Sequence, residues 1–263
     1  MAGKNKKELG QHWLKDRGVL TNIAMCAKMG DVGTVLEIGP GLGTLTSALF
    51  LHFPRVVAVE FDEDIAGKLM GQFPGKELTV VTGNVLDVEI EARGKELVVR
   101  MGEKEVALPE KYVVAGNIPY YITAPIVRKF LTMKNKPAKM ALLVQKEVAE
   151  RLAGGVGEYS ILGLSAQIYA KVSLGPTVER GMFTPPPKVD SQVVIFEPYD
   201  EPLADEDVMR VIVRGFKSPR KKLKNNLELE EGILTTIGAD ERARPADLTI
   251  DAWKKLAKYL HKR

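Results

Sequence analysis

In its N-terminal part the chain alternates short apolar runs with stretches in which apolar residues recur at helical spacing. The runs predict β-strands, and they lie at residues 33–38, 55–61, 78–81, 112–115 and 140–144. The helical stretches lie at residues 19–29, 44–51, 65–72 and 126–133. Strands that alternate with helices predict βαβ units and a mostly parallel sheet. Because ligands of such sheets bind at the carboxyl ends of the strands, we expect functional residues to follow these runs.

Two segments depart from this alternation. Residues 88–108 alternate polar and apolar side chains, which predicts an inserted β-hairpin or meander. A last apolar strand at residues 193–196 leads into a proline-rich, acidic stretch that indicates a domain boundary. Helical spacing resumes beyond it, at residues 208–216, 223–229 and 253–260. We therefore predict an α/β domain with helices on both faces of its sheet, followed by a small all-helical domain, over residues 1–198 and 199–263.

The glycine-rich stretch after the first strand is the strongest chemical signal. Gly39, Gly41 and Gly43 let the backbone turn tightly and approach a ligand closely. Glu60 ends the second strand about 20 residues later, where a carboxylate accepts both hydroxyls of a ribose. Dinucleotide enzymes use G-x-G-x-x-G, whereas the spacing here is G-x-G-x-G, and Glu37 is awkward beside a pyrophosphate but tolerable beside a sulfonium. The motif favours S-adenosylmethionine over NAD; a turn that binds nothing is the alternative.

Polar side chains also follow the third and fourth strands. Asn84 follows the third, and its side-chain oxygen can accept from the adenine amine of the cofactor, although Gly-Asn is also an ordinary turn pair. Asn117 follows the fourth. An adenine amine is a poor nucleophile because its lone pair is delocalised into the ring. Two acceptors aimed at its N–H groups would draw the lone pair out, and the Asn117 side-chain oxygen and the Ile118 carbonyl are the natural pair.

The remaining residues of this site would position the target base. Pro119 restricts Ile118 to extended conformations and so helps to fix its carbonyl. Tyr120 can stack on the base. Phe183 begins a rigid, proline-rich loop and can pack against the other face of a flipped base, but it can equally be a core residue. These residues predict methylation of adenine N6, whereas a plain turn after a strand is the other interpretation of the tetrapeptide.

Charge and composition indicate a binding partner and a cellular location. Residues 214–224 contain six cationic residues and no acidic one, which suits a phosphate backbone or a solvated helix face. A single cysteine, Cys26, and three histidines cannot assemble a zinc motif, so no metal is expected. With no secretory signal and no apolar run near the ~20 residues that span a bilayer, we expect a cytoplasmic protein without a membrane partner. The predicted RNA contacts are Arg220, Lys221, Lys222 and Lys224.

Together these motifs resemble the KsgA family of small-subunit ribosomal RNA adenine dimethyltransferases over nearly the whole chain. The resemblance rests on LEIGPGLGTLT, NIPY, GQHWL at residues 10–14, QKEVAERL at 145–152, FTPPPKVDS at 183–191, FKSPRKKLKNNL at 216–227 and GADERARPADL at 238–248. It implies a Rossmann-like class I methyltransferase sheet that uses S-adenosylmethionine. The family dimethylates two adjacent adenines in a hairpin near the 3′ end of small-subunit rRNA and needs no metal.

The resemblance also assigns roles to residues. It implies that the cofactor is bound by His12, Leu14, Gly39, Glu60, Asn84 and Asn117, and that the adenine is held by Asn117, Tyr120 and Phe183. The implied partner is small-subunit rRNA in a 30S-type pre-ribosomal particle, and a monomer is expected. Two features depart from the family: Asn84 stands where Asp is usual, and the stretch at residues 88–108 is longer than the family needs and has no assignable role.

Three other functions use a similar catalytic domain. A large-subunit rRNA methyltransferase of the resistance type is the nearest, and the RKKLKNNL tail argues against it. A non-catalytic assembly or transcription factor would keep the fold without the chemistry, but Asn117, Tyr120, Glu60 and the glycine loop are intact. A protein-glutamine methyltransferase would also use Asn-x-Pro-Tyr, yet it would not explain the Phe183 loop or the basic tail.

Overall fold

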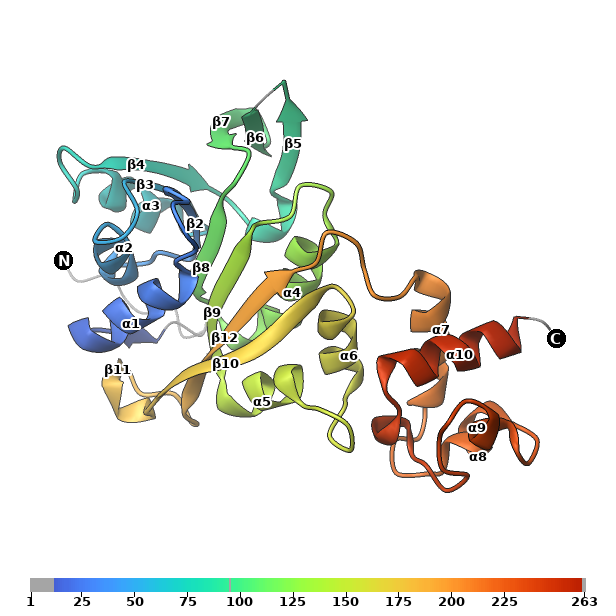
Figure 1. Cartoon of the computed structure of the whole chain (residues 1–263). Helices are drawn as coiled ribbons and strands as arrows, with labels where there is room; N and C mark the ends of the chain where they lie inside the picture. Colours follow the sequence, from blue (N-terminus) through green and yellow to red (C-terminus); the bar gives the residue numbers. More distant parts are fainter. Residues whose placement is uncertain (1–11, 95, 262–263) are drawn as a thin grey trace. The chain divides into compact units, whose positions relative to one another are not determined.

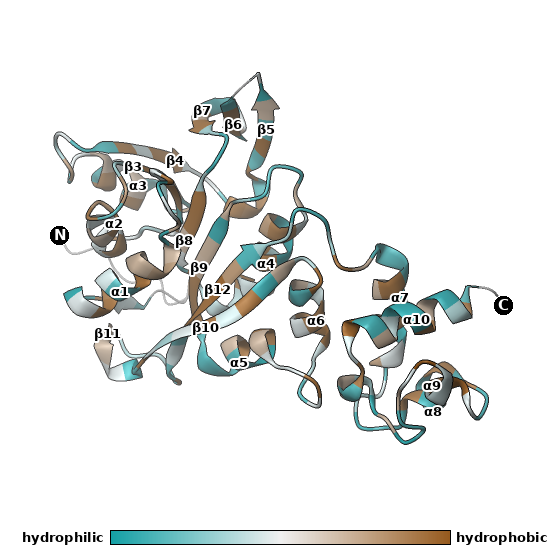
Figure 2. Ribbon diagram, viewed as in Figure 1, coloured by the Kyte–Doolittle hydropathy of each residue, from teal (hydrophilic) through white to brown (hydrophobic). Residues whose placement is uncertain are grey.

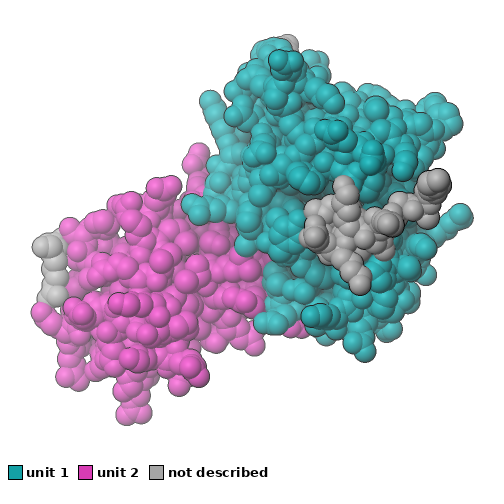
Figure 3. Space-filling model, turned by 180° about the vertical axis from the view of Figure 1, so that it is seen from behind, with its two compact units in different colours: residues 1–149, 173–198 teal, residues 150–172, 199–263 magenta. Residues whose placement is uncertain are grey.

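The protein consists of two compact units, which Figure 3 shows in different colours. The computed structural model describes residues 12–94 and 96–261. The first unit comprises the chain up to residue 149 together with residues 173–198, and the second comprises residues 150–172 and the chain from residue 199. The second unit therefore includes residues 150–172, which the sequence placed in the first domain. The predicted division into functional domains at residue 198 stays a prediction.

A seven-stranded sheet with the order β10-β12-β9-β8-β2-β3-β4 forms the centre of the first unit (Figure 1). The five neighbouring strands from β9 to β4 are parallel, and β12 is antiparallel to β9. The predicted mostly parallel sheet is thus confirmed. Its strands are β2 (Thr34–Ile38), β3 (Arg55–Glu60), β4 (Glu77–Thr82), β8 (Val113–Asn117), β9 (Lys139–Gln145), β10 (Ala170–Val178) and β12 (Ser191–Pro198).

Helices cover both faces of this sheet, as predicted. The connection β2–α2–β3 advances toward one edge and β8–α4–β9 toward the other, so right-handed crossovers place α2 and α4 on opposite faces (Figure 1). Helix α1 packs with α2, and their apolar side chains meet alternate strand residues such as Val35, Val113 and Leu143. Figure 2 shows that hydrophobic residues are frequent along the central strands. The helices are α1 (Arg17–Ala27), α2 (Thr44–Leu49), α3 (Glu63–Met70) and α4 (Thr123–Thr132).

The strand order reverses between β2 and β8, and this point defines the site. Ile38 of β2 pairs with Val59 of β3 on one side and with Gly116 of β8 on the other. The next residues along the chain after Ile38, Val59 and Gly116 are Gly39, Glu60 and Asn117. These three residues therefore lie side by side at the carboxyl ends of the strands. Ligands of open α/β sheets bind at such a reversal.

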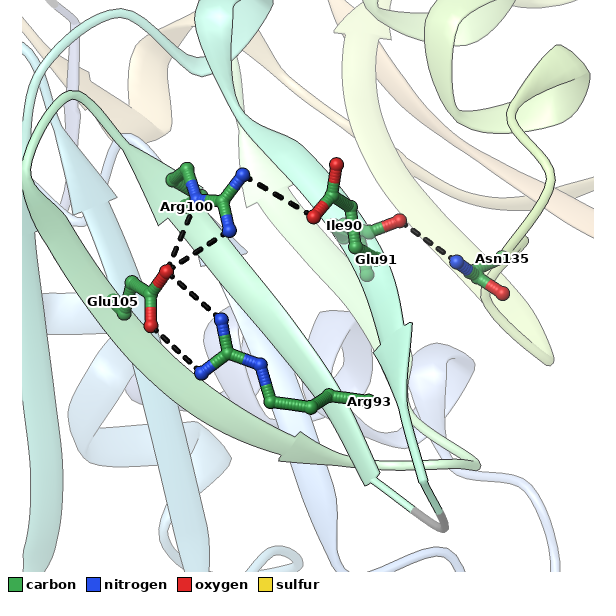
Figure 4. Close-up of polar contacts among 6 residues, drawn as sticks. All are labelled: Ile90, Glu91, Arg93, Arg100, Glu105 and Asn135. Carbon is green, nitrogen blue, oxygen red and sulfur yellow. Dashed lines mark hydrogen bonds and ion pairs between the residues drawn. The ribbon is translucent and has the colours of Figure 1, made fainter.

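The inserted segment forms a separate three-stranded antiparallel sheet, which confirms the predicted meander. Its strands are β5 (Glu89–Arg93), β6 (Glu96–Met101) and β7 (Lys104–Pro109). Glu105 accepts hydrogen bonds from both Arg93 and Arg100, and Arg100 also pairs with Glu91 (Figure 4). These exposed ion pairs neutralise the two arginines, so neither presents an unpaired charge to a phosphate backbone.

The second unit is built from helices around its own hydrophobic core. Trp253 is fully buried there, stacks on Phe216 with ring centroids 6.1 Å apart, and packs with Ile212, Leu223 and Leu256. No helix of residues 12–94 or 96–261 is long and apolar enough to cross a membrane. Helix α5 (Lys146–Ala153) runs into this unit, whose other helices are α6 (Ile161–Gln167), α7 (Glu206–Gly215), α8 (Leu223–Leu227), α9 (Ile233–Thr236) and α10 (Ile250–Leu260).

Candidate active site and RNA-binding surface

The glycine loop adopts the backbone that the motif predicts. Gly39, Gly41 and Gly43 have φ angles of 64°, 55° and 77°, in the left-handed region that favours glycine. A Cβ at Gly39 would come no closer than 4.0 Å to any atom outside its neighbours, and that atom is the Asn117 carbonyl oxygen. Gly39 therefore leaves open space that a side chain would fill, which fits a ligand lying against the backbone.

Gly41 lies against an aromatic side chain, and its predicted contact with the cofactor stays a prediction. A Cβ built on Gly41 would collide with the ring of Trp13, so the indole covers this glycine directly. Sequence reasoning placed Gly41 where the backbone approaches the ligand, but the structure places an aromatic ring against it. A bulky residue at position 41 would thus displace Trp13, while Gly39 is the glycine that faces open space. Gly41 still lines the same cavity as Gly39 and Glu60.

The Glu60 carboxylate is buried at the end of β3, with 6% of the residue exposed. Its Oε2 accepts from the Gly41 amide at 3.0 Å and its Oε1 from the Asp62 amide at 3.0 Å. Each carboxylate oxygen has a second lone pair, so both can still accept a ribose hydroxyl. The two amide bonds fix the orientation of the carboxylate before any ligand binds.

Glu60→Ala should weaken binding of S-adenosylhomocysteine by about 1.5–3 kcal/mol, the range for hydrogen bonds to a charged group. That loss corresponds to a roughly 10- to 150-fold higher dissociation constant in a calorimetric titration. Glu63→Ala is the matched control, because Glu63 is an exposed carboxylate in the first turn of α3. Equal affinity of the Glu60 variant and wild type would contradict the assignment of this carboxylate to the ribose.

Glu37 lies in β2 beneath the loop and is completely buried. Its Oε2 accepts from the Thr46 hydroxyl at 2.7 Å, whereas Oε1 has no hydrogen-bond partner in the part of the chain that the structure describes. Burial raises the pKa of Glu37 to about 8, with the Thr46 hydrogen bond acting in the opposite direction and the charge of Glu60 adding to the rise. The carboxyl is therefore mainly protonated at neutral pH, and the negative charge that sequence reasoning placed before the loop is largely absent.

This buried carboxyl predicts a pH-dependent stability. The folded-state pKa of Glu37 lies above the ordinary value of 4.5, so the unfolded chain releases this proton first as the pH rises. Stability should fall from about pH 4.5 to about pH 8, by up to about 1.4 kcal/mol per pH unit. Glu37→Gln should lack that fall. The free energy of unfolding of the variant in urea, relative to wild type, should therefore increase between pH 5 and pH 8. Parallel pH profiles of the two proteins would show that Glu37 does not titrate in this range.

The segment before α1 connects the glycine loop with the proline-rich loop. Strand β1 (Trp13–Leu14) pairs antiparallel with β11 (Phe183–Thr184), and His12 Nδ1 lies 2.8 Å from the Pro185 carbonyl oxygen. Leu14 is 1% exposed and belongs to the core of the unit. Gly10 and Gln11 of the predicted N-terminal motif lie outside the described residues. Nothing in the sequence pattern predicted this pairing, because strands of such length have no periodicity.

The Asn117-Ile118-Pro119-Tyr120 tetrapeptide begins where β8 ends. Asn117 Nδ2 donates to the His12 carbonyl oxygen at 3.2 Å, and Oδ1 of the same amide has no hydrogen-bond partner among the described residues. The Tyr120 hydroxyl lies 2.7 Å from Ser191 Oγ, and the ring stacks on His12 with centroids 6.0 Å apart. Ser191, which sequence reasoning did not single out, therefore holds the hydroxyl of Tyr120 in place, and the contact with His12 restrains the tilt of the ring.

One cavity brings most of the predicted residues together. It is lined by all four residues of the tetrapeptide and by the predicted cofactor residues His12, Leu14, Gly39, Gly41 and Glu60. Asn84 lines a second hollow, which shares Gly39 and Glu60 with the first. Phe183 lines neither: it is 3% exposed and packs in the core beside Leu14 and Val178. Its position matches the core alternative that the sequence left open, and a contact with the base stays a prediction.

The predicted basic cluster lines a hollow in the second unit. Leu223 N donates to the Ala243 carbonyl oxygen at 2.8 Å, so the chain before α8 lies beside residues 242–244. Arg242 and Arg244, which sequence reasoning did not assign, therefore join the cluster, and Glu228 is the acidic residue among the lining residues. Most of the cations precede α8 rather than forming a helix face. The cationic lining residues are Lys217, Arg220, Lys221, Lys222, Lys224, Arg242 and Arg244.

Comparisons with known proteins identify the family and the fold of this chain. The sequence profile of the ribosomal RNA adenine dimethylase family matches residues 2–262. A Geobacter sulfurreducens protein named ribosomal RNA small subunit methyltransferase A is 36% identical over 97% of this chain and 95% of its own. The solved structure of 23S rRNA methyltransferase ErmE has a TM-score of 0.73 at 26% identity, covering 95% of this chain and 99% of that one. A dimethyladenosine transferase from Plasmodium falciparum shares the fold, with a TM-score of 0.75 at 24% identity over 95% and 98% of the two chains.

The fold and the site together define a methyltransferase with a Rossmann-like sheet, which confirms the predicted fold class. The glycine loop, the ribose carboxylate and the tetrapeptide after β8 occupy the point where the strand order reverses. The chain belongs to the ribosomal RNA adenine dimethylase family, as its motifs predicted. It is therefore an S-adenosylmethionine-dependent enzyme that methylates adenine in ribosomal RNA.

Proposed function

We propose that this enzyme transfers methyl groups from S-adenosylmethionine to N6 of two adjacent adenines in a hairpin near the 3′ end of small-subunit rRNA. The observation that carries the proposal is the orientation of the Asn117 amide: its nitrogen is bonded to His12, and its oxygen, which has no partner among the described residues, lies in a cavity shared by the tetrapeptide and the glycine loop. The proposed substrate is a 30S-type pre-ribosomal particle, on which the enzyme acts as a cytoplasmic monomer.

The cofactor fits the residues that the cavity provides. Gly39 leaves room against the backbone, and the Glu60 oxygens are oriented to accept ribose hydroxyls. When bound, S-adenosylmethionine supplies an electrophilic methyl group. His12 and Leu14, on the segment that crosses the loop, and Asn117 line the same cavity and would complete the cofactor contacts.

The tetrapeptide would activate the target amine for methyl transfer. The Asn117 Oδ1 and the Ile118 carbonyl oxygen would accept from the two N–H groups, which draws the nitrogen lone pair out of the ring and stabilises the developing positive charge. Pro119 follows Ile118 directly, and the clash of its ring with the preceding residue limits Ile118 to extended conformations. Tyr120, held by Ser191 and stacked on His12, would support the base. Methyl transfer gives a methylated cation at N6 that is strongly acidic and loses its proton readily, so no strong general base is required.

The basic hollow would bind the RNA backbone. Its cationic side chains come from residues 217–224 and from Arg242 and Arg244, so they form a concave surface rather than a single stripe. A concave cluster of lysines and arginines suits phosphates on more than one side of a folded RNA. The four predicted contacts, Arg220, Lys221, Lys222 and Lys224, all line it.

A large-subunit substrate is the competing proposal, and the likeness to ErmE favours it. The relatives at 35–36% identity are small-subunit enzymes by name, and this supports the 30S-type particle. Transfer of radiolabelled methyl groups to unmethylated 30S particles and to protein-free large-subunit RNA, followed by mapping of the label, tests the choice. Label on adjacent adenines near the 3′ end of the small-subunit RNA is expected. Label only on the large-subunit RNA would replace the proposal, and no label on either would favour a non-catalytic role.

A further inference from the structure

The imidazole of His12 contacts two parts of the site that lie far apart in the sequence. Its Nδ1 lies 2.8 Å from the carbonyl oxygen of Pro185, and its ring stacks on Tyr120 with an angle of 23° between the two ring planes. A carbonyl oxygen can only accept, so Nδ1 must carry the hydrogen of this bond. The His12 ring therefore presents a donor to the proline-rich loop and a flat face to the tetrapeptide.

These contacts belong to a closed ring of contacts that includes Tyr120. The Tyr120 hydroxyl lies 2.7 Å from Ser191 Oγ, and Ser191 is completely buried at the start of β12. The proline-rich loop connects Ser191 to Pro185, and His12 connects Pro185 back to the Tyr120 ring. Tyr120 is thus held at its hydroxyl and at one ring face, and a base that stacks on it would use the opposite face.

The bond to Asn117 is made by the backbone of His12 and not by its ring. The His12 carbonyl oxygen accepts from Asn117 Nδ2 at 3.2 Å. Strand β1, which starts at the next residue, is held by its pairing with β11. Substitutions of the His12 side chain should therefore leave this bond and the path of the backbone in place. They would remove only the contacts of the ring with Pro185 and Tyr120, so the role of the ring can be tested separately.

We propose that the ring of His12 is a positioning residue for the target adenine, which acts through Tyr120 and does not bind the cofactor. This inference rests on the proposed function, since it takes Tyr120 to support the target base. The two groups that the ring contacts, Tyr120 and the proline-rich loop, are the parts assigned to the base, whereas Gly39 and Glu60 are assigned to the cofactor. The cofactor contact proposed for His12 is then made by its backbone.

Two substitutions separate the contacts of the ring. His12→Asn keeps a donor for the Pro185 carbonyl oxygen but has no ring, and His12→Phe keeps a ring but has no donor. Each should lower the single-turnover rate of methyl transfer to unmethylated 30S particles by about 2- to 10-fold, the cost of one aromatic contact or one neutral hydrogen bond. The affinity for S-adenosylhomocysteine in a calorimetric titration should stay unchanged. His261→Asn is the matched control, because His261 is exposed and lines neither hollow of the site, and it should methylate at the wild-type rate.

A double-mutant cycle with Tyr120 tests how the ring acts. In a Tyr120→Ala background His12→Asn should cause no further loss of rate, because the ring would have no aromatic partner to position. An equal loss in both backgrounds would overturn the inference, and so would wild-type rates for both His12 variants. A fall in S-adenosylhomocysteine affinity as large as the fall in rate would assign the ring to the cofactor, which overturns the inference and leaves the proposed function standing. If wild type transfers no methyl group to the particle, both proposals fail.

Discussion

Asn117→Ala should cut the rate of methyl transfer by about 10²–10³, the usual cost of losing one group that stabilises charge in the transition state. The free Oδ1 of Asn117 would accept from the adenine amine mainly as positive charge develops there. Cofactor affinity should fall less, because most cofactor contacts come from the glycine loop and Glu60. RNA affinity should change little. Single-turnover methylation of unmethylated 30S particles, with cofactor and RNA binding measured separately, gives all three quantities.

Two variants sharpen this experiment. Asn117→Asp keeps an acceptor but loses the donor to the His12 carbonyl oxygen, so it should retain more activity than alanine. Asn135→Ala is the matched control, because the Asn135 amide also donates to a carbonyl oxygen, that of Ile90 in the meander (Figure 4). It should methylate at the wild-type rate. If Asn117→Ala also methylates at that rate, the tetrapeptide does not perform the chemistry.

Replacing Lys221, Lys222 and Lys224 together by alanine should weaken particle binding and flatten its dependence on salt. Each lost phosphate contact removes about 0.7–0.9 from the slope of log affinity against log salt, so the slope should change by roughly 2–3. If the variant and wild type bind equally at 1 M salt, a slope change of this size makes the variant about 10²–10³-fold weaker at 0.1 M salt. The measurement is particle binding between 50 and 300 mM salt, a range in which ~10 Å screening makes such contacts salt-sensitive.

The control for this experiment removes the same number of positive charges from a different surface. Lys254, Lys255 and Lys258 are exposed on α10 of the same unit and do not line the basic hollow. Their triple alanine variant should keep most of the wild-type salt slope. If both triple variants flatten the slope equally, the effect is one of net charge. A wild-type slope in the Lys221, Lys222 and Lys224 variant would show that the cluster is only a solvated surface.

The sequence by itself determined the parallel strands of the sheet and the location of the site at their ends. Buried parallel strands read as continuous apolar runs, so each strand and the residue that follows it can be identified without the fold. Gly39, Glu60 and Asn117 each end or follow such a run, and the rule that ligands bind at the carboxyl edge brings them together. The meander was also evident, because period-two alternation is a local property.

Only the tertiary structure revealed the contacts between distant segments. Strands β1 and β11 are each two residues long and far apart in the chain, so no pattern within either indicates their pairing. Strand β10 contains Gly175 and Pro176, which weaken the local signal for a strand. Arg242 and Arg244 join the basic hollow through a backbone contact that lies outside any motif.

The tertiary structure also decided the polarity and charge of individual groups. The same residue type is a donor at Asn117, whose nitrogen is bonded to a backbone carbonyl, and an acceptor at Asn84, whose oxygen is bonded to a backbone amide. Glu37 reads as a negative charge in the sequence, but complete burial raises the pKa of its carboxyl to about 8. A side chain's type is fixed by the sequence, whereas the hydrogen bonds and the solvent that set its polarity and protonation come from residues distant in the chain.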